Sequence, residues 1–372
     1  MAYALCNLPR SSVGRPCVRA VTRCGYWQTR QLTSSPRTAF KDDRQQATDP
    51  KSSPFDSSRL AYLSRSKVQD GTEGVLTLTL NRPTAANAIS TTLLSQLQDA
   101  LAYLRFPGIS SNDNSGAQKT LDTNSPSPVR TLIIRSAAPK IFCAGADLKE
   151  RATMTIPQVD AFLSSLRSAF SAVERLPCPV IAALDGLAMG GGLELALCAD
   201  IRVAGPSATR LGLTEAKLGI IPGAGGTQRM SRLLGPSKAK DLIFSGRLLN
   251  AEQAYDIGLV DHLATAENSG ASAQGEEAYG KALELAAEMS QNGPLALRAA
   301  KLAIDKGSQM DMYVQIGQIL FSNTATHASS RLNSETALDF ERECYERLFG
   351  TEDRLEGLRA FKEKRKPKYI GR

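Results

Sequence analysis

The chain has 372 residues, of which 42% are hydrophobic and 22% are charged. This composition is typical of a globular protein that buries a sizeable core, in one large or two medium domains. The most hydrophobic stretch, residues 180–204, is interrupted by Asp185, Glu194, Asp200 and several glycines, which excludes a membrane span there.

The net charge of +8 is concentrated at the N-terminus. Residues 1–41 contain six arginines, one lysine and no acidic residue, so the rest of the chain is nearly neutral. An arginine-rich, acid-free start is typical of an organellar transit peptide, although a disordered basic arm is an alternative. We therefore expect a mitochondrial transit peptide over 1–34, a location in the matrix, and a polar linker over 35–68.

Three of the seven cysteines fall in this N-terminal segment. The other four are too scattered for a zinc site or a disulfide framework, so we expect small buried hydrophobic side chains; they are Cys143, Cys178, Cys198 and Cys344.

The first half of the folded part mixes strands and helices. Leucines alternate with threonines over 76–80, which predicts a half-buried strand. Leucines on one side of 90–105 predict a helix, and 106–128 is a surface loop rich in Ser, Asn, Gly and Pro. A second strand is expected over 129–136 and a second helix over 156–176.

The central stretch, residues 179–226, combines a buried strand with glycines and acids. Gly190, Gly191 and Gly192 precede a helical pattern that contains Glu194. The first turn of a helix has free N–H groups and the positive end of the dipole, and glycine lets a ligand approach the backbone. This pattern indicates an anion or oxyanion site with a carboxylate one turn away. The alternative is an ordinary turn followed by a solvated glutamate.

Two further features point to the same chemistry. Glu215 follows in apolar surroundings, ahead of a second glycine cluster over 223–226. In the earlier segment KIFCAGADLKE, residues 140–150, the N–H of Ala146 could be a second oxyanion donor; alternatively this is a turn in which Asp147 caps a helix. Two carboxylates beside a donor-rich loop indicate general acid/base catalysis next to a polarised carbonyl.

The second half is predominantly helical. No G-x-G-x-x-G motif follows the first strand, which argues against a doubly wound dinucleotide-binding fold. A loop is expected over 264–275. The expected helices are 228–234, 236–245, 251–257, 276–291, 295–306, 310–326, 335–349 and a charged helix before Pro367.

The segments FCAGADLKE, DGLAMGGGLELALCADIRVA, LGLTEAKLGIIPGAGGTQR and DRLEGLRAFKEKR together resemble the crotonase (enoyl-CoA hydratase/isomerase) superfamily over residues 70–372. The resemblance implies an α/β fold: a spiral of ββα units over 69–305, with 106–128 as a surface loop, and a helical oligomerisation region over 306–372. It also implies assembly into a trimer or a dimer of trimers.

The resemblance also implies roles for individual residues. Glu194 and Glu215 correspond to the two hydratase carboxylates, and the N–H groups of Ala146 and Gly191 correspond to the oxyanion hole. The resemblance implies no metal or redox cofactor. CoA is part of the substrate. The implied substrate-binding residues are Ala146, Asp147, Leu148, Lys149, Gly191, Phe361 and Lys364.

The implied activity is that of a hydro-lyase acting on an acyl-CoA thioester. Within the superfamily the chain is most similar to the methylglutaconyl-CoA hydratases of leucine degradation, so we expect that substrate or a short-chain enoyl-CoA. An isomerase of the same superfamily, which typically uses one carboxylate, is the first alternative. A nucleophilic hydrolase is weaker, because the only histidines, His262 and His327, lie far from a serine elbow, and Cys143 has no evident basic partner.

An RNA-binding protein is an alternative of another class. A relative binds AU-rich RNA through a lysine-rich helix, but the matching helix here, 90–105, has no lysine and only one arginine, Arg105. Because binding phosphate groups requires several positive charges on one face, we expect RNA binding to be weak or absent.

The charge distribution predicts processing of the N-terminus. Because residues 1–41 are basic and free of acids, the mature protein should begin within about ten residues of the expected transit peptide's end, between positions 33 and 45. N-terminal sequencing of endogenous protein checks this, and an intact Met1 or Ala2 would contradict it.

Overall fold

The fold is taken from a computed structural model that describes residues 53–65, 74–105, 129–269, 275–310 and 336–372. All of these residues belong to one compact unit, Asp49–Arg372. The expected transit peptide, the loop 106–128 and nearly all of the expected helix 310–326 lie outside the described residues.

A six-stranded sheet has the strand order β1-β2-β3-β5-β7-β9. β1 pairs antiparallel with β2, and all other pairs are parallel. The strands of this large sheet are β1 (Ala61–Arg65), β2 (Val75–Leu80), β3 (Thr131–Ser136), β5 (Val180–Leu184), β7 (Ile201–Ala204) and β9 (His262–Leu263).

A second, smaller sheet has three parallel strands in the order β4-β6-β8. Its strands are β4 (Lys140–Cys143), β6 (Gly186–Met189) and β8 (Leu211–Gly212).

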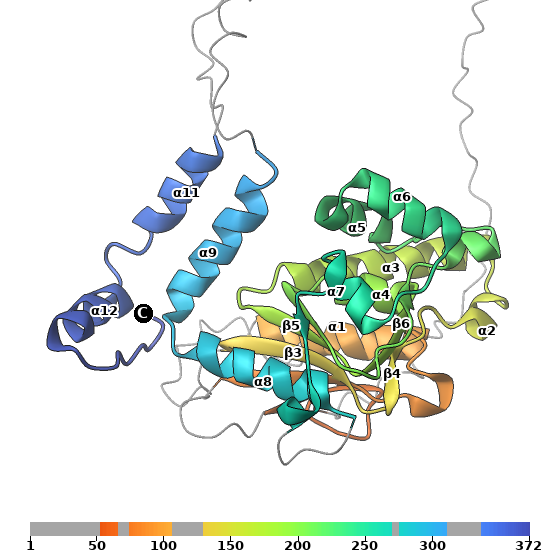
Figure 1. Ribbon diagram of the computed structural model, residues 1–372, viewed down its shortest axis with the longest axis horizontal. Helices are drawn as coiled ribbons and strands as arrows, with labels where there is room; N and C mark the ends of the chain where they lie inside the picture. The colour runs from red at the N-terminus through yellow and green to blue at the C-terminus, as the bar shows by residue number, and fades with distance from the viewer. Residues whose placement is uncertain (1–52, 66–73, 106–128, 270–274, 311–335) are drawn as a thin grey trace, which may run out of the picture. The chain divides into compact units, whose positions relative to one another are not determined.

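The chain alternates between the two sheets and then forms a helix (Figure 1). β3 and β4 lead to α2 and α3, β5 and β6 lead to α4, and β7 and β8 lead to α5. This repeat is the spiral of ββα units that the sequence predicted. The helices of the spiral are α2 (Leu148–Arg151), α3 (Ile156–Glu174), α4 (Gly191–Ala196) and α5 (Gly226–Leu234).

The large sheet is buried on both faces, because successive side chains of a strand point to opposite faces. The leucines of β2 pack into the main core with α1 (Thr91–Arg105). Thr77 lies on the other face, where its Oγ1 is 3.2 Å from Oη of Tyr279 in α8 (Glu277–Ser290). The expectation of a half-buried strand over 76–80 was therefore wrong: α8 covers the threonine face.

The N-terminal edge of the sheet corrects a second expectation. Part of the presumed linker over 35–68 forms β1, in which Ala61 pairs with Leu80. Ala61 and Leu63 are fully buried, and Gln96 Oε1 accepts a hydrogen bond of 2.7 Å from the Leu60 N–H. The alternating residues of a five-residue strand, set in a polar segment, gave too weak a pattern to be predicted.

The expected helices of the second half are confirmed within a few residues wherever the structure describes them. Strand β9 within this half was missed. These helices are α6 (Pro236–Ser245), α7 (Ala251–Asp256), α8, α9 (Pro294–Gly307), α11 (Ala337–Glu346) and α12 (Glu352–Glu363).

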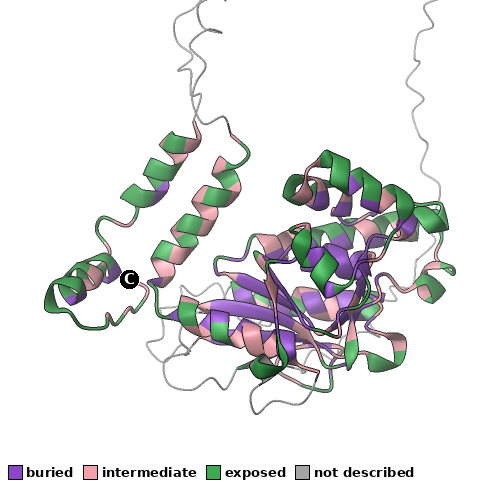
Figure 2. Ribbon diagram, viewed as in Figure 1, coloured by how far each residue is buried: buried purple, intermediate pink, exposed green. Residues whose placement is uncertain are grey.

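Burial is concentrated in the strands and in α4, whereas the helices expose one side (Figure 2). Cys143, Cys178, Cys198 and Cys344 are free and buried, as expected. In the described part of the chain, no helix has the length and apolarity needed to cross a bilayer.

Helix α4 is buried along its whole length and packs directly against β4. A Cβ at Gly192 would lie 2.1 Å from the carbonyl oxygen of Cys143, which is backbone and cannot move aside. Only glycine therefore allows α4 to approach β4 this closely.

Gly192→Ala should consequently lower the free energy of unfolding by about 1–3 kcal/mol or more, because it overpacks a rigid contact. Gly350→Ala is the control, since a Cβ there meets nothing within 4 Å, and it should change stability by less than about 1 kcal/mol. Urea unfolding of both variants checks this. Equal stabilities would contradict the close approach.

Candidate active site

Each strand of the small sheet is followed by one part of the candidate site. Ala146 follows β4, Gly191 and Glu194 follow β6, and Glu215 follows β8. Because the three strands are parallel, their carboxyl ends lie at the same edge of the sheet. This is the edge where open α/β sheets bind ligands.

Two backbone N–H groups lie side by side at this edge. A Cβ on Gly191 would be 3.5 Å from the nitrogen of Ala146. Ala146 is bridged to Ile89 through its neighbours: Ile89 N–H donates to Gly145 O, and Asp147 N–H donates to Ile89 O. In such a parallel bridge the N–H of Ala146 points away from Ile89. Neither this N–H nor that of Gly191 has an acceptor among the described residues.

Glu194 is held in a defined position although it is buried. Only 2% of the surface of Glu194 is exposed. Its Oε1 accepts hydrogen bonds of 2.8 Å from the N–H groups of Ala224 and Gly226. Gly226 is the first residue of α5, so the positive end of that helix faces the carboxylate. The alternative of a solvated glutamate in a first helical turn is thereby excluded.

Burial raises the pKa of Glu194 above its usual value, and the N–H donors of Gly226 and Ala224 oppose this effect. The second glycine cluster thus has a definite role in this structure, which is to favour the charged form of the carboxylate.

Glu215 lies in a different environment. It is 9% exposed, and its Oε2 is buried with no hydrogen-bond partner among the described residues. A Cβ on Gly190 would be 3.1 Å from Oε1 of Glu215, so the absence of a side chain at this glycine makes room for the carboxyl group. Its positive φ of +49° also favours glycine here. Burial raises the pKa of Glu215 to about 7, and the negative charge of Glu194 adds to the shift.

Both carboxyl groups and both N–H groups face one cavity of about 1160 Å³. Apolar side chains of α3 and of the segment before α5 form much of its wall, among them Val159, Leu163, Leu166, Ile220 and Ile221. The cavity can therefore take an apolar acyl group with a carbonyl oxygen at the two N–H groups.

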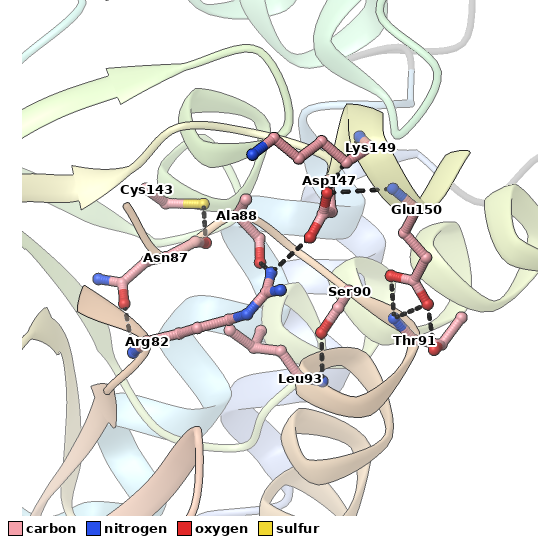
Figure 3. Close-up of polar contacts among 10 residues, drawn as sticks. All are labelled: Arg82, Asn87, Ala88, Ser90, Thr91, Leu93, Cys143, Asp147, Lys149 and Glu150. Carbon is pink, nitrogen blue, oxygen red and sulfur yellow. Dashed lines mark hydrogen bonds and ion pairs between the residues drawn. The ribbon is translucent and has the colours of Figure 1, made fainter. Parts of the chain in front are cut away.

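A polar network positions the loop that carries Ala146 (Figure 3). Arg82 Nη1 donates 2.7 Å hydrogen bonds to Asp147 Oδ2 and to Ala88 O. Asp147 Oδ1 in turn caps α2 by accepting from the N–H groups of Lys149 and Glu150. These contacts join the segment before α1 to the turn between β4 and α2.

Comparison with known proteins agrees with this geometry. Residues 117–331 match the family model described as enoyl-CoA hydratase/isomerase. The chain is 44% identical over 304 residues to the mouse mitochondrial methylglutaconyl-CoA hydratase, which is 82% of each chain. It is 41% identical over 300 residues to mouse enoyl-CoA hydratase domain-containing protein 2, mitochondrial, covering 81% of this chain and 86% of the relative.

The chain belongs to the enoyl-CoA hydratase/isomerase family. A solved enoyl-CoA hydratase from Bacillus anthracis is 38% identical, with a TM-score of 0.67, and the match covers 84% of this chain and all of that one. The resemblance that the sequence motifs indicated, and the crotonase fold that it implied, are confirmed.

The family residues predicted from the motifs are only partly brought together. Ala146, Leu148, Gly191, Glu194 and Glu215 line the cavity. The expected substrate-binding residues that are not among its lining residues are Asp147, Lys149, Phe361 and Lys364.

Two of these four have clear surroundings. The side chain of Asp147 caps α2, as the alternative interpretation of its turn proposed. Phe361 in α12 is 86% exposed, so its ring is accessible to a substrate or to another subunit.

The weaker nucleophilic alternative loses support in this family member. Burial raises the pKa of the Cys143 thiol to about 12, so the reactive thiolate is negligible at neutral pH. His262 lies in strand β9, and His327 lies outside the described residues.

The sequence did not predict an ion pair between an arginine and a glutamate that lies beside the catalytic candidates. Arg229 in α5 forms an ion pair of 2.9 Å with Glu174 in α3 and also donates to Ala224 O. Both residues line the cavity. The only feature of the sequence that could have indicated Arg229 as a site residue is its position three residues after Gly226, the first residue of α5.

The raised pKa of Glu215 predicts how stability depends on pH. The group titrates near its ordinary value of 4.5 when unfolded and at about 7 when folded. The folded state therefore binds more protons between these values, and stability falls as the pH rises through this window.

Glu215→Gln removes the buried charge, so at pH 8 it should be more stable than wild type by on the order of 2–3 kcal/mol, with no difference below about pH 4.5. Urea unfolding at equal protein concentration measures this, with the exposed Glu288→Gln as the control. A variant that is less stable than wild type at pH 8 would contradict the assignment.

Proposed function

We propose that this chain is an enoyl-CoA hydratase, a hydro-lyase that adds water across the double bond of an α,β-unsaturated acyl-CoA thioester. The proposal rests on one observation: two carboxyl groups of different proton affinity face the same cavity as two backbone N–H groups that have no acceptor in the part of the chain that the structure describes. Relatives named as hydratases support it.

The N–H groups of Ala146 and Gly191 act on the thioester oxygen. As water adds to the β carbon, electrons of the double bond move toward the thioester and its oxygen gains negative charge. Two preorganised donors stabilise this enolate, an effect of roughly 3–4 kcal/mol per donor in comparable oxyanion holes. The network of Arg82 and Asp147 fixes the donor of Ala146.

The two carboxyl groups divide the proton transfers. Glu194 receives two N–H hydrogen bonds and faces a helix N-terminus, which favours its ionised form. It takes a proton from water as the oxygen attacks the β carbon. Glu215, whose pKa is about 7, keeps a proton more readily than Glu194 does, and it gives this proton to the α carbon. The pair thus holds one proton before and after the reaction, and the roles are exchanged in dehydration.

An isomerase of the same family remains the second candidate, since isomerisation moves a proton between carbons and can use one carboxylate. The presence of two carboxyl groups in one cavity favours hydration, because water must be deprotonated while carbon is protonated.

The proposed acyl groups are 3-methylglutaconyl, as in leucine degradation, and short enoyl chains. CoA enters as part of the substrate, and the reaction needs no metal or redox cofactor. In the described ranges, no group of three or more His, Cys, Asp and Glu side chains is arranged to hold a metal ion. Lys149, Lys364 and Phe361 are proposed to contact CoA.

The proposed cellular setting is the mitochondrial matrix, and relatives are named as mitochondrial proteins. We propose a trimer or a dimer of trimers, because the C-terminal helices expose apolar side chains that a neighbouring subunit would cover. These side chains are Tyr345, Leu355, Leu358 and Phe361, and Phe349 in the turn between α11 and α12 is exposed as well. RNA binding is not proposed, since α1 contains no lysine.

Purified protein tested against crotonyl-CoA in a spectrophotometric hydration assay examines the proposal. Glu194→Gln and Glu215→Gln should each lower kcat by about 10²–10⁴-fold, because glutamine keeps the shape but cannot exchange a proton. Substrate affinity should change much less. The double variant should lose less than the product of the two single effects, since both groups act in one step.

Glu288→Gln on the exposed face of α8 is the control and should retain wild-type turnover. Near-normal hydration by Glu215→Gln, with Glu194→Gln inactive, would instead support the single-carboxylate isomerase.

A further inference from the structure

The cavity wall carries positive charge that the proton transfers of hydration do not use. Four arginines are among its lining residues, namely Arg151, Arg167, Arg229 and Arg232. An apolar enoyl chain needs none of them at its distal end, so their individual surroundings indicate what else the cavity can bind.

Two of the arginines already have partners. The ion pair with Glu174 compensates the charge of Arg229, and Arg232 donates from Nη1 to the backbone and side-chain oxygens of Gln228 in its own helix. Arg229 and Arg167 both act on the proposed base, since their positive charges lower the pKa of Glu194.

Arg167 differs from Arg229 in having a free guanidinium edge. Its Nε donates a 2.8 Å hydrogen bond to Gly223 O, which anchors the group. Its two Nη groups have no acceptor among the described residues. An arginine anchored in this way presents two parallel donors, the geometry that binds a carboxylate in a bidentate manner.

The anchor also fixes where this edge lies. Gly223 directly precedes Ala224, whose N–H holds Glu194. On α3, Leu163 and Arg167 are four residues apart and lie on the same face, and Leu163 packs against Gly223. The guanidinium therefore stands on the loop that positions the proposed base, with an apolar wall beside it.

We propose that Arg167 binds a second carboxylate on the acyl group, so that the enzyme takes dicarboxylic enoyl thioesters whose distal carboxylate carbon is two bonds beyond the β carbon. This inference rests on the proposed function, in which Glu194 directs water to the β carbon. Because only two bonds separate it from the β carbon, this carboxylate stays close to the base, and the cation next to the loop that positions the base is the guanidinium of Arg167 in α3, anchored on Gly223 O.

The test compares glutaconyl-CoA, which has this carboxylate, with crotonyl-CoA, which lacks it. The readout is the ratio of their kcat/KM values, because any effect of Arg167 on Glu194 itself acts on both substrates and cancels. In Arg167→Met the ratio should fall by at least about 10-fold, the usual effect of losing a charge-assisted bidentate contact. Arg167→Lys should give an intermediate ratio, since lysine keeps the charge without the fork.

Arg232→Met is the matched control, an arginine of the same cavity with partners in its own helix, and its ratio should stay within about 2-fold of wild type. A second readout uses binding of two unreactive thioesters by calorimetry: wild type should bind glutaryl-CoA more tightly than butyryl-CoA, and Arg167→Lys should reduce this preference. The calorimetric comparison also applies if Arg167→Met does not fold.

The outcomes separate the two proposals. Wild-type hydration of crotonyl-CoA with an unchanged ratio in Arg167→Met would overturn the inference and leave the hydratase intact. An equal fall of the ratio in Arg232→Met, or tighter binding of butyryl-CoA by wild type, would overturn it as well. Wild-type protein that hydrates neither thioester would overturn both proposals.

Discussion

The site depends on the burial of two carboxyl groups in one cavity with unequal compensation. Glu194 accepts two backbone N–H hydrogen bonds at the start of α5, whereas one oxygen of Glu215 has no partner among the described residues. Burial raises both pKa values, and backbone donors oppose the shift at both groups, but at Glu215 the negative charge of Glu194 adds to the shift and the pKa reaches about 7. The difference lets one group accept a proton while the other gives one. The raised pKa has a stability cost at alkaline pH, where the buried Glu215 is charged.

The small parallel sheet explains how residues far apart in the chain reach this cavity. Its three strands end at one edge, and each is followed by a functional segment. Close backbone contacts then fix the segments: Gly192 allows α4 to touch β4, and Gly190 makes room for Glu215. The glycines therefore act mainly through packing, and the oxyanion donors follow from the same packing.

Local patterns in the sequence predicted much of this arrangement. The helices α1 and α3, the four buried cysteines and the helical second half followed from periodicity, and the family followed from motifs around Ala146, Glu194 and Glu215. Strand β1 and the burial of Thr77 were missed because both depend on pairing with distant segments. The partners of Glu194 and the anchor of Arg167 were equally inaccessible, since each joins α4 or α3 to the segment before α5.

Hydration by this site requires that the pair of carboxyl groups holds one proton. The most direct measurement is the pH dependence of kcat/KM for crotonyl-CoA, which reports ionisations of the free enzyme. A charged Glu194 and a protonated Glu215 should give a bell-shaped profile with an alkaline limb near the Glu215 pKa of about 7, and no such limb in the residual activity of Glu215→Gln. A wild-type profile that stays flat from about pH 6 to pH 9 would contradict it.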